Sequence, residues 1–300
     1  MKSLKPVWCS LFLLVGSVSM AHAQAAHEFK DVVYATIDGK ALGVDIYLPA
    51  NVKSPPLIVW VHGGAWYLYD KSQYPKALVA SGFAVASVDF RQSTEAKFPA
   101  QVHDIKAAIR FLRAKSNDYG YSADKIAIAG ASSGGHLAAM VGVTNGNKEL
   151  EGSVGDFSQQ SSEVQAIVDY FGASNLTTIL TQSTPYGLGV RKPALDKLLG
   201  GQPEAVPDLA KLASPVFHVD AKDPPLFLLH GDQDPQMPIN QSHELEGAYE
   251  MLGLKVHLEV VHGAGHAGPK FYEEPYLKHT VAFLNEIVVP RKRKGQFEKY

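Results

Sequence analysis

The stretch that decides the fold is Ile126-Ala127-Ile128-Ala129-Gly130-Ala131-Ser132-Ser133-Gly134-Gly135-His136. Its first four residues are a continuous apolar run, which indicates a strand buried on both faces, and residues 136–143 are compatible with a helix. Gly130 and Gly134 stand two residues before and two residues after Ser132, so the turn between the two elements can be tight. A serine at the apex of a strand-turn-helix is a nucleophile elbow, and we therefore predict Ser132 as a nucleophile.

The structural context carries this prediction, because a bare Gly-x-Ser-x-Gly pattern is weak evidence. Ser133 is the rival serine, but its spacing to the two glycines does not fit the turn. The helix that begins behind Ser132 also places a partial positive charge where an oxyanion would develop.

Strand-like and helix-like runs alternate along most of the chain. A hairpin is expected over residues 29–48, with its turn at Asp38-Gly39, followed by apolar strands at 57–61, 83–88, 126–129, 164–171, 226–229 and 256–261. Helices are expected around residues 102–112, 137–143 and 277–288. This order predicts the α/β class, with a doubly wound and mostly parallel sheet forming a single domain over residues 24–290.

Residues 172–223 interrupt the alternation with several prolines and glycines, short helical pieces and no clear strand. We expect an insertion that acts as a small lid or as a wall of a substrate pocket. A plain solvated connection is the alternative.

The first 23 residues have the pattern of a cleaved signal peptide. Two lysines precede an apolar run at residues 7–18, and Ala21-His22-Ala23 gives a small-x-small cleavage site. The run is too short to span a bilayer, so we expect no membrane span in the mature chain and an exported protein, periplasmic or extracellular. The leader also contains Cys9, the single cysteine.

Charge excludes few function classes. The formal net charge is −2 for the whole chain and becomes −4 without residues 1–23, which contain two lysines and no acidic residue. This mildly acidic surface does not indicate binding to nucleic acid or membranes. The basic residues 291–294 lie in a tail, residues 291–300, that we expect to be a solvated end.

A serine hydroxyl needs a base, and the base needs an orienting acid, which follow the serine in the order acid then histidine in this type of fold. Asp234 follows the strand at 226–229, at the end of the sheet where catalytic groups gather, and is our predicted acid. Asp232 and Asp169 are the alternatives.

His266 is the predicted base, because a glycine-rich loop carries it beyond the strand at 256–261, whereas His262 is still at the strand end. The histidines expected to be structural or on the surface are His103, His218, His243, His257 and His279.

Backbone N–H groups are expected to stabilise an oxyanion. Ser133 would supply one, and Gly64 and Ala65 would supply others from the loop after the strand at 57–61, with Gly63 as a further candidate. A tight turn alone is the alternative explanation of these glycines. The scheme needs no metal and no cofactor, and no motif for either is present in the sequence.

On these residues the sequence resembles the esterase/lipase branch of the α/β-hydrolase fold that carries a His-Gly-Gly oxyanion motif, most closely the bacterial bifunctional feruloyl and acetyl-xylan esterase-like group. The matching segments are His62-Gly63-Gly64-Ala65-Trp66, Phe98-Pro99-Ala100-Gln101-Val102-His103-Asp104, Gly130 to Gly135, His230-Gly231 with Asp234, and Gly265-His266. The resemblance implies a triad of Ser132, Asp234 and His266 and an oxyanion hole from Gly64, Ala65 and Ser133. It departs from related esterases at Ala65, where a third glycine is common, and His-Gly-Gly-x-Trp is also similar to kynurenine formamidases.

The expected function is therefore a serine carboxylic-ester hydrolase acting on small or aryl/acyl esters, with plant-polysaccharide acyl esters as a substrate by analogy. The alternatives are an amidase-type hydrolase, either an arylformamidase or an exopeptidase, and a non-enzymatic binding protein on the same scaffold. Trp66, Tyr67, Tyr69 and Tyr186 could line an acyl or aryl pocket or could be packing residues.

Overall fold

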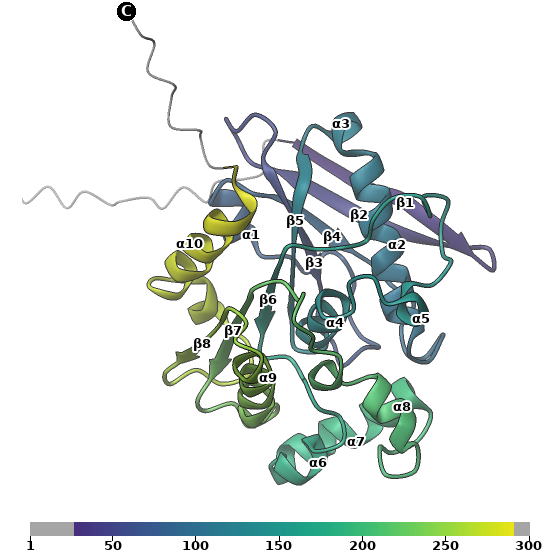
Figure 1. The fold of residues 1–300 in the computed structure, drawn as a ribbon, viewed down its shortest axis with the longest axis vertical. Coiled ribbons are helices and arrows are strands. Elements are labelled where there is room, and N and C mark those ends of the chain that lie inside the picture. The colour runs from purple at the N-terminus through teal and green to yellow at the C-terminus, as the bar shows by residue number, and fades with distance from the viewer. Residues whose placement is uncertain (1–26, 291–300) are drawn as a thin grey trace, which may run out of the picture.

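The computed structural model describes residues 27–290, and one twisted sheet runs through this part of the chain (Figure 1). Its strands lie in the order β1-β2-β4-β3-β5-β6-β7-β8. Their bounds are β1 His27–Ile37, β2 Lys40–Leu48, β3 Pro56–Val61, β4 Ala84–Val88, β5 Ser122–Ala131, β6 Ala166–Tyr170, β7 Leu226–Gly231 and β8 Val256–Val261. All neighbours from β4 to β8 pair in parallel, while β1 and β2 form an antiparallel hairpin. The predicted doubly wound, mostly parallel sheet and its N-terminal hairpin are confirmed.

Helices cover both faces of the sheet. The bounds of the covering helices are α1 Lys76–Ala80 and α10 Tyr276–Val288 on one face, α2 Ala100–Ala114, α4 Ser133–Gly142 and α9 Asn240–Met251 on the other, with the short α3 Ser116–Tyr119 and α5 Lys148–Glu151 beside α2. Successive strand residues contribute alternately to the two cores: Leu57 belongs to the core on the side of α2 and α4, and Ile58 belongs to the core on the side of α1 and α10. Burial on both faces explains why the strands are continuous apolar runs in the sequence.

The predicted apolar face of α2 is fully buried. Val102, Ile105, Ile109 and Leu112 have no exposed surface. Each buried aliphatic side chain contributes roughly 1.5–3 kcal/mol, so this face fixes the helix on the sheet although the helix has no side-chain N-cap.

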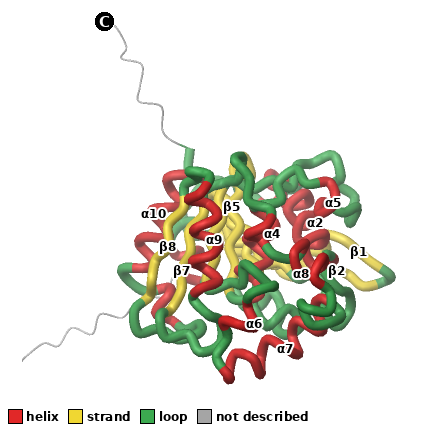
Figure 2. Tube along the Cα trace, turned by 60° about the horizontal axis from the view of Figure 1, so that its bottom comes forward, coloured by secondary structure: helices red, strands yellow, loops and turns green. Residues whose placement is uncertain are grey.

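The insertion at residues 172–223 is helical and packed. It contains α6 Ile179–Gln182, α7 Pro185–Leu199, α8 Pro207–Leu212 and a 3₁₀ turn, η1 Pro215–Phe217, with α6 to α8 grouped at one end of the molecule (Figures 1 and 2). The helix α7 has 15 residues and is longer than the short pieces we expected. Thr184 caps its start by accepting a hydrogen bond from Gly187 N, and its last two turns bury Ala194, Leu195 and Leu198. The insertion is therefore not a plain solvated connection.

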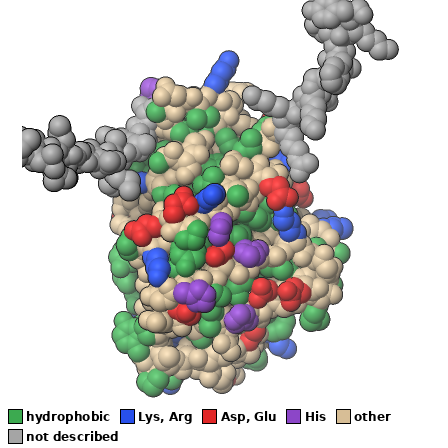
Figure 3. Space-filling view, turned by 90° about the vertical axis from the view of Figure 1, so that its left-hand side faces the viewer, with side chains coloured by type: hydrophobic (Ala, Val, Ile, Leu, Met, Phe, Trp, Pro, Cys, Tyr) green, Lys and Arg blue, Asp and Glu red, His purple; other side chains and the backbone are tan. Residues whose placement is uncertain are grey.

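The edge strand β8 borders a polar face. Figure 3 shows histidine and acidic side chains mixed on this side of the molecule, where Glu259 contacts both His257 and His279. Such charged groups beside an edge strand hinder pairing with other chains.

Two predicted segments, the signal peptide at 1–23 and the basic tail at 291–300, lie outside the described residues. Within residues 27–290, no helix has the length and apolar character needed to cross a membrane.

Candidate active site

Ser132 lies at a strained turn between β5 and α4, as predicted for a nucleophile elbow. Its φ is 57° and its ψ is −121°, and its N–H donates to Tyr170 O at 2.8 Å. The flanking glycines leave no room for side chains: a Cβ on Gly130 would lie 2.2 Å from Gly134 O, and a Cβ on Gly134 would lie 2.1 Å from Val61 O. The two glycines are thus required by close backbone packing around a serine in the left-handed region.

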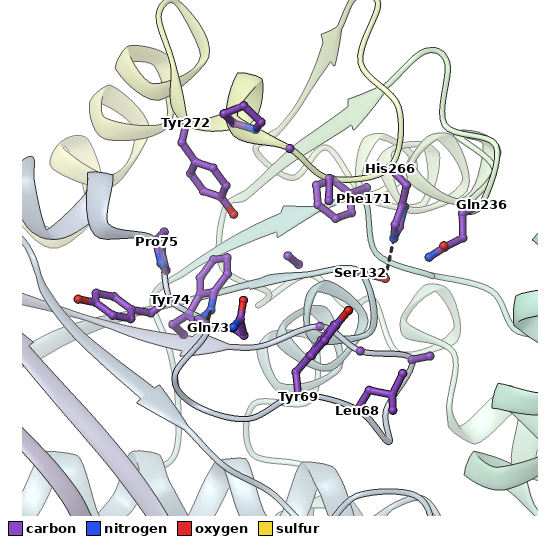
Figure 4. A pocket seen from close by; sticks show the side chains of 18 of the residues that line it. Leu68, Tyr69, Gln73, Tyr74, Pro75, Ser132, Phe171, Gln236, His266 and Tyr272 are labelled. Carbon is purple, nitrogen blue, oxygen red and sulfur yellow. Dashed lines mark hydrogen bonds between the residues drawn. The ribbon is translucent and has the colours of Figure 1, made fainter. Parts of the chain in front are cut away.

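The structure brings Ser132, His266 and Asp234 together in one chain of hydrogen bonds. Ser132 Oγ lies 3.0 Å from His266 Nε2, the contact drawn in Figure 4, and His266 Nδ1 lies 2.6 Å from Asp234 Oδ2. A carboxylate can only accept, so Nδ1 carries the proton and Nε2 is free to accept from the serine. This is the arrangement in which an imidazole serves as a general base to a hydroxyl.

Asp234 is held as a carboxylate. Its side chain is fully buried, and its Oδ1 accepts from the N–H groups of Gln236 and Met237, both at 2.8 Å. Burial alone would raise the pKa of Asp234, but hydrogen bonds from His230 and His266 outweigh it and hold the pKa well below its usual range. The acid therefore orients His266 with its charge intact across the neutral pH range.

The alternative acids occupy other places. Asp232 pairs with His262 at 2.9 Å, but this pair is on the surface, with 79% of the His262 side chain exposed. Asp169 is buried beneath the first turn of α4 and accepts from Gly172 N at 2.8 Å, with no bond to His266. Neither aspartate is part of the hydrogen-bonded chain that joins Ser132 to His266.

The predicted oxyanion loop lies against the elbow. Because β3 and β5 are neighbours with Val61 opposite Gly130, the segments that follow them start side by side. A Cβ on Gly63 would lie 2.9 Å from Ala131 O, and Gly64 and Ala65 line the same pocket as Ser132. Within the loop Gly64 O accepts from Tyr67 N at 3.0 Å and from Leu68 N at 2.8 Å, which closes a tight turn over residues 64–68.

The third predicted donor, Ser133, heads α4 directly behind the nucleophile. N–H groups in the first turn of a helix have no intrahelical acceptor and carry the positive end of the helix dipole. The side chain of Ser133 is buried and its Oγ has no hydrogen-bond partner among the described residues, so only its backbone is available to the site.

A pocket of about 800 Å³ opens at Ser132 and His266. Its aromatic wall comes from Trp60, Phe171 and Tyr272, and Tyr74 and Pro75 continue it away from the serine (Figure 4). Tyr67, Leu68 and Tyr69 also line the pocket, and Lys76 and Glu273 add charged groups to the lining. The space is a largely apolar slot with a few polar groups, which suits an organic acyl or alcohol group.

The structure separates the four aromatic residues that the sequence left undecided. Tyr67 and Tyr69 line the pocket, whereas Trp66 is fully buried outside the lining and Tyr186 is 63% exposed and also outside it. From the insertion only Val190 is in the lining, so that segment forms a small part of the pocket wall.

Sequence reasoning missed most of the aromatic wall, which comes from four distant segments, and it missed His136, whose buried ring contacts Trp66. Among residues 27–290, no group of three or more histidine, cysteine or acidic side chains is placed to hold a metal ion.

The sheet order, the elbow and the Ser132–His266–Asp234 arrangement define an α/β-hydrolase fold. The model of the BD-FAE family matches residues 44–249, which is more than half of the chain, and the protein belongs to this family.

Relatives and solved structures agree with this assignment. A truncated carbohydrate esterase from gut microbiota is 34% identical, with a TM-score of 0.79, over 89% of this chain and 98% of that one. A bifunctional GH43-CE protein of Bacteroides eggerthii is 33% identical, with a TM-score of 0.77, over 89% of this chain and 36% of that one. Esterase LipQ of Mycobacterium tuberculosis is 30% identical over 77% of this chain and 55% of its own length. The chain spans about half the length of the curated relatives LipQ and LipM.

Proposed function

We propose that the protein is a serine carboxylic-ester hydrolase that works through an acyl-enzyme on Ser132. One observation carries the proposal: Ser132 Oγ, His266 and the buried Asp234 form a continuous hydrogen-bonded chain, and Ser132 and His266 line a largely apolar pocket. The names of the relatives, which are esterases, support the same reaction class.

The geometry supports the following steps. Ser132 Oγ attacks the ester carbonyl while His266 Nε2 takes its proton, and the carbonyl oxygen becomes an oxyanion facing the N–H groups of Gly64, Ala65 and Ser133. His266 then gives the proton to the departing alcohol. Water, deprotonated by the same histidine, attacks the acyl-enzyme and releases the acid and free Ser132.

The test is Ser132→Ala with short-chain 4-nitrophenyl esters, with Ser133→Ala as the matched control. Removing Oγ at 132 should abolish turnover and labelling by a fluorophosphonate while the circular dichroism spectrum stays unchanged. Removing the buried and unpartnered Oγ at 133 should leave kcat within about twofold, because only the backbone of that residue faces the site. Full turnover in a folded Ser132→Ala protein would falsify the mechanism.

For the substrate we propose small or aryl acyl esters, including acyl esters of plant polysaccharides. The aromatic wall formed by Trp60, Phe171 and Tyr272 supports a planar acyl group, and a carbohydrate esterase is among the similar structures. A screen of acetyl, butyryl and feruloyl esters beside an N-formyl aromatic amide tests this on one preparation. Faster turnover of the amide would replace the esterase proposal by an amidase. Export to the periplasm or the medium stays a prediction, which cell fractionation would test.

A further inference from the structure

The oxyanion loop has an unusual backbone. Gly64, Ala65 and Trp66 are three consecutive residues with positive φ, of 107°, 52° and 66°. Residues with a Cβ pay roughly 1–2 kcal/mol for this region, so Ala65 and Trp66 hold their conformation only if the surroundings impose it. Backbone bonds impose it in part, because Ser93 N donates to Trp66 O at 2.8 Å. Of the two side chains, Trp66 can contribute more, because Ala65 has only a methyl group.

The Trp66 indole is fixed by a buried hydrogen bond. Its Nε1 donates to His136 Nδ1 at 3.0 Å, with the two rings perpendicular and their centroids 5.3 Å apart. His136 Nε2 in turn donates to Ala213 O at 2.7 Å. Both side chains are completely buried. The two bonds fix one tautomer of the ring, with the proton on Nε2.

His136 cannot easily become charged in this place. Burial is the main influence and lowers its pKa to about 4. No acidic side chain is among its hydrogen-bond partners, which are the indole of Trp66 and the carbonyl of Ala213. His136 therefore stays a neutral acceptor for Trp66 near neutral pH.

The bond connects the two halves of the site. His136 is in the first turn of α4, where its N–H donates to Ser132 O at 3.0 Å, and Trp66 follows the predicted oxyanion donors directly. Ala213, at the C-terminal end of α8, adds the insertion as a third segment, and the Arg191 guanidinium lies 6.0 Å from the centre of the Trp66 ring. The nucleophile helix, the oxyanion loop and the insertion are thus joined at one buried indole.

We propose that Trp66 and His136 are positioning residues that hold the N–H groups of Gly64 and Ala65 at the distance from Ser132 that the oxyanion requires. The proposal rests on the serine mechanism proposed above. Neither side chain lines the pocket, so neither binds the substrate. A change in their hydrogen bond should therefore act on the transition state, which carries the oxyanion, and not on ground-state binding.

The first test is Trp66→Phe, which keeps an aromatic ring but removes the donor. Loss of one oxyanion donor costs about 10²–10³-fold in kcat, so a loop that is displaced but not lost should cost about 10–100-fold. KM for a 4-nitrophenyl ester should stay within about twofold, and the rate of phosphonylation by a fluorophosphonate should fall in parallel with kcat. An unchanged kcat in the folded variant overturns the proposal.

A pair of substitutions at His136 separates positioning from general destabilisation. In His136→Asn the side-chain oxygen can take the place of Nδ1 and accept from Trp66, whereas in His136→Gln the amide takes the place of Nε2 and serves only Ala213 O. Both variants disturb the same buried site, but the asparagine variant should retain at least about tenfold more kcat than the glutamine variant. Equal kcat values in the two variants, or a higher kcat in the glutamine variant, overturn the proposal. This comparison does not depend on whether Trp66→Phe folds.

Tyr121→Phe is the matched control. Tyr121 immediately precedes β5, and its buried hydroxyl donates to Leu112 O of α2 at 2.8 Å. It is not part of the pocket lining, so its removal should lower Tm with kcat unchanged. Labelling distinguishes the two hypotheses: if wild-type protein is not labelled at Ser132, the serine mechanism fails, and if it is labelled while the Trp66 and His136 variants keep full kcat, only the positioning proposal fails.

Discussion

Substitution of Asp234 by asparagine gives the sharpest test of the site. The asparagine oxygen can still accept from the N–H groups of Gln236 and Met237, which now bond to Oδ1 at 2.8 Å. Its NH₂ group then faces His266 Nδ1, which in the wild-type protein donates to Asp234 Oδ2 at 2.6 Å. A donor at this place favours the tautomer with the proton on Nε2, and that nitrogen can no longer accept from Ser132 Oγ.

The expected loss follows from this reversal. A wrong tautomer with intact geometry costs about 10⁴-fold in kcat in serine hydrolases, equivalent to about 5.5 kcal/mol of transition-state stabilisation. KM should change little, because the Asp234 side chain is fully buried and touches no part of the pocket. Steady-state kinetics on a 4-nitrophenyl ester, with circular dichroism to check folding, measure the effect.

The chain supplies a matched control in Asp232→Asn. Asp232 also bonds to the Nδ1 of a histidine, His262, at 2.9 Å, but this pair is exposed and apart from Ser132. Its removal should leave kcat within about twofold. The reasoning would be refuted by a loss of less than tenfold in Asp234→Asn, or by a larger loss in Asp232→Asn than in Asp234→Asn.

Two further predictions concern stability. Burial raises the pKa of Asp169 to about 7, above the value of about 3.9 for an aspartate in an unfolded chain. Between these two values the folded state holds a proton that the unfolded state releases. The free energy of unfolding should therefore fall as the pH rises from about 4 to about 7. Asp169→Asn should flatten this part of the profile in urea unfolding at pH 5 and pH 8, and an identical slope in both proteins would contradict the assignment. Gly134→Ala should prevent folding or lower the free energy of unfolding by more than about 3 kcal/mol, because its Cβ would lie 2.1 Å from Val61 O. Gly247→Ala, in α9 with nothing within 4 Å of the added Cβ, should raise the free energy of unfolding by about 0.5–1 kcal/mol. Thermal unfolding of both variants measures the difference, and similar Tm values would count against the packing argument.

The parts of this molecule that the sequence predicted well are those with a local physical cause. Gly130 and Gly134, which the tight turn requires, are each two residues from Ser132. The strand before the turn and the helix after it are also adjacent to it in the chain. Asp234 and His266 could be chosen because each follows a strand of the parallel part of the sheet, and parallel strands end at the same edge. The strand before Asp234 is buried as expected, whereas β8, before His266, is an edge strand with only its last residue buried.

The parts that the sequence could not predict depend on contacts between distant segments. Trp66 and His136 are 70 residues apart, and nothing in either local pattern shows that one nitrogen will face the other. The pocket wall combines Trp60 of β3, Phe171 directly after β6 and Tyr272 of a 3₁₀ turn, η2 Pro269–Tyr272. The long helix α7 was underestimated because glycines and Pro193 interrupt its pattern, while its cap and its buried C-terminal half hold it in place.

Strain is located on both sides of the position that an oxyanion would occupy. Ser132 has a φ of 57° on one side, and Ala65 and Trp66 have values of 52° and 66° on the other. Each such residue costs about 1–3 kcal/mol, and the packed sheet offsets the cost by placing the ends of β3 and β5 next to each other. The elbow is held by backbone bonds, through Tyr170 O and the glycine contacts. The oxyanion loop combines backbone bonds, from Leu68 N to Gly64 O and from Ser93 N to Trp66 O, with one buried side-chain pair. The loop is therefore the half of the site in which a substitution far from the pocket can lower kcat while the fold survives.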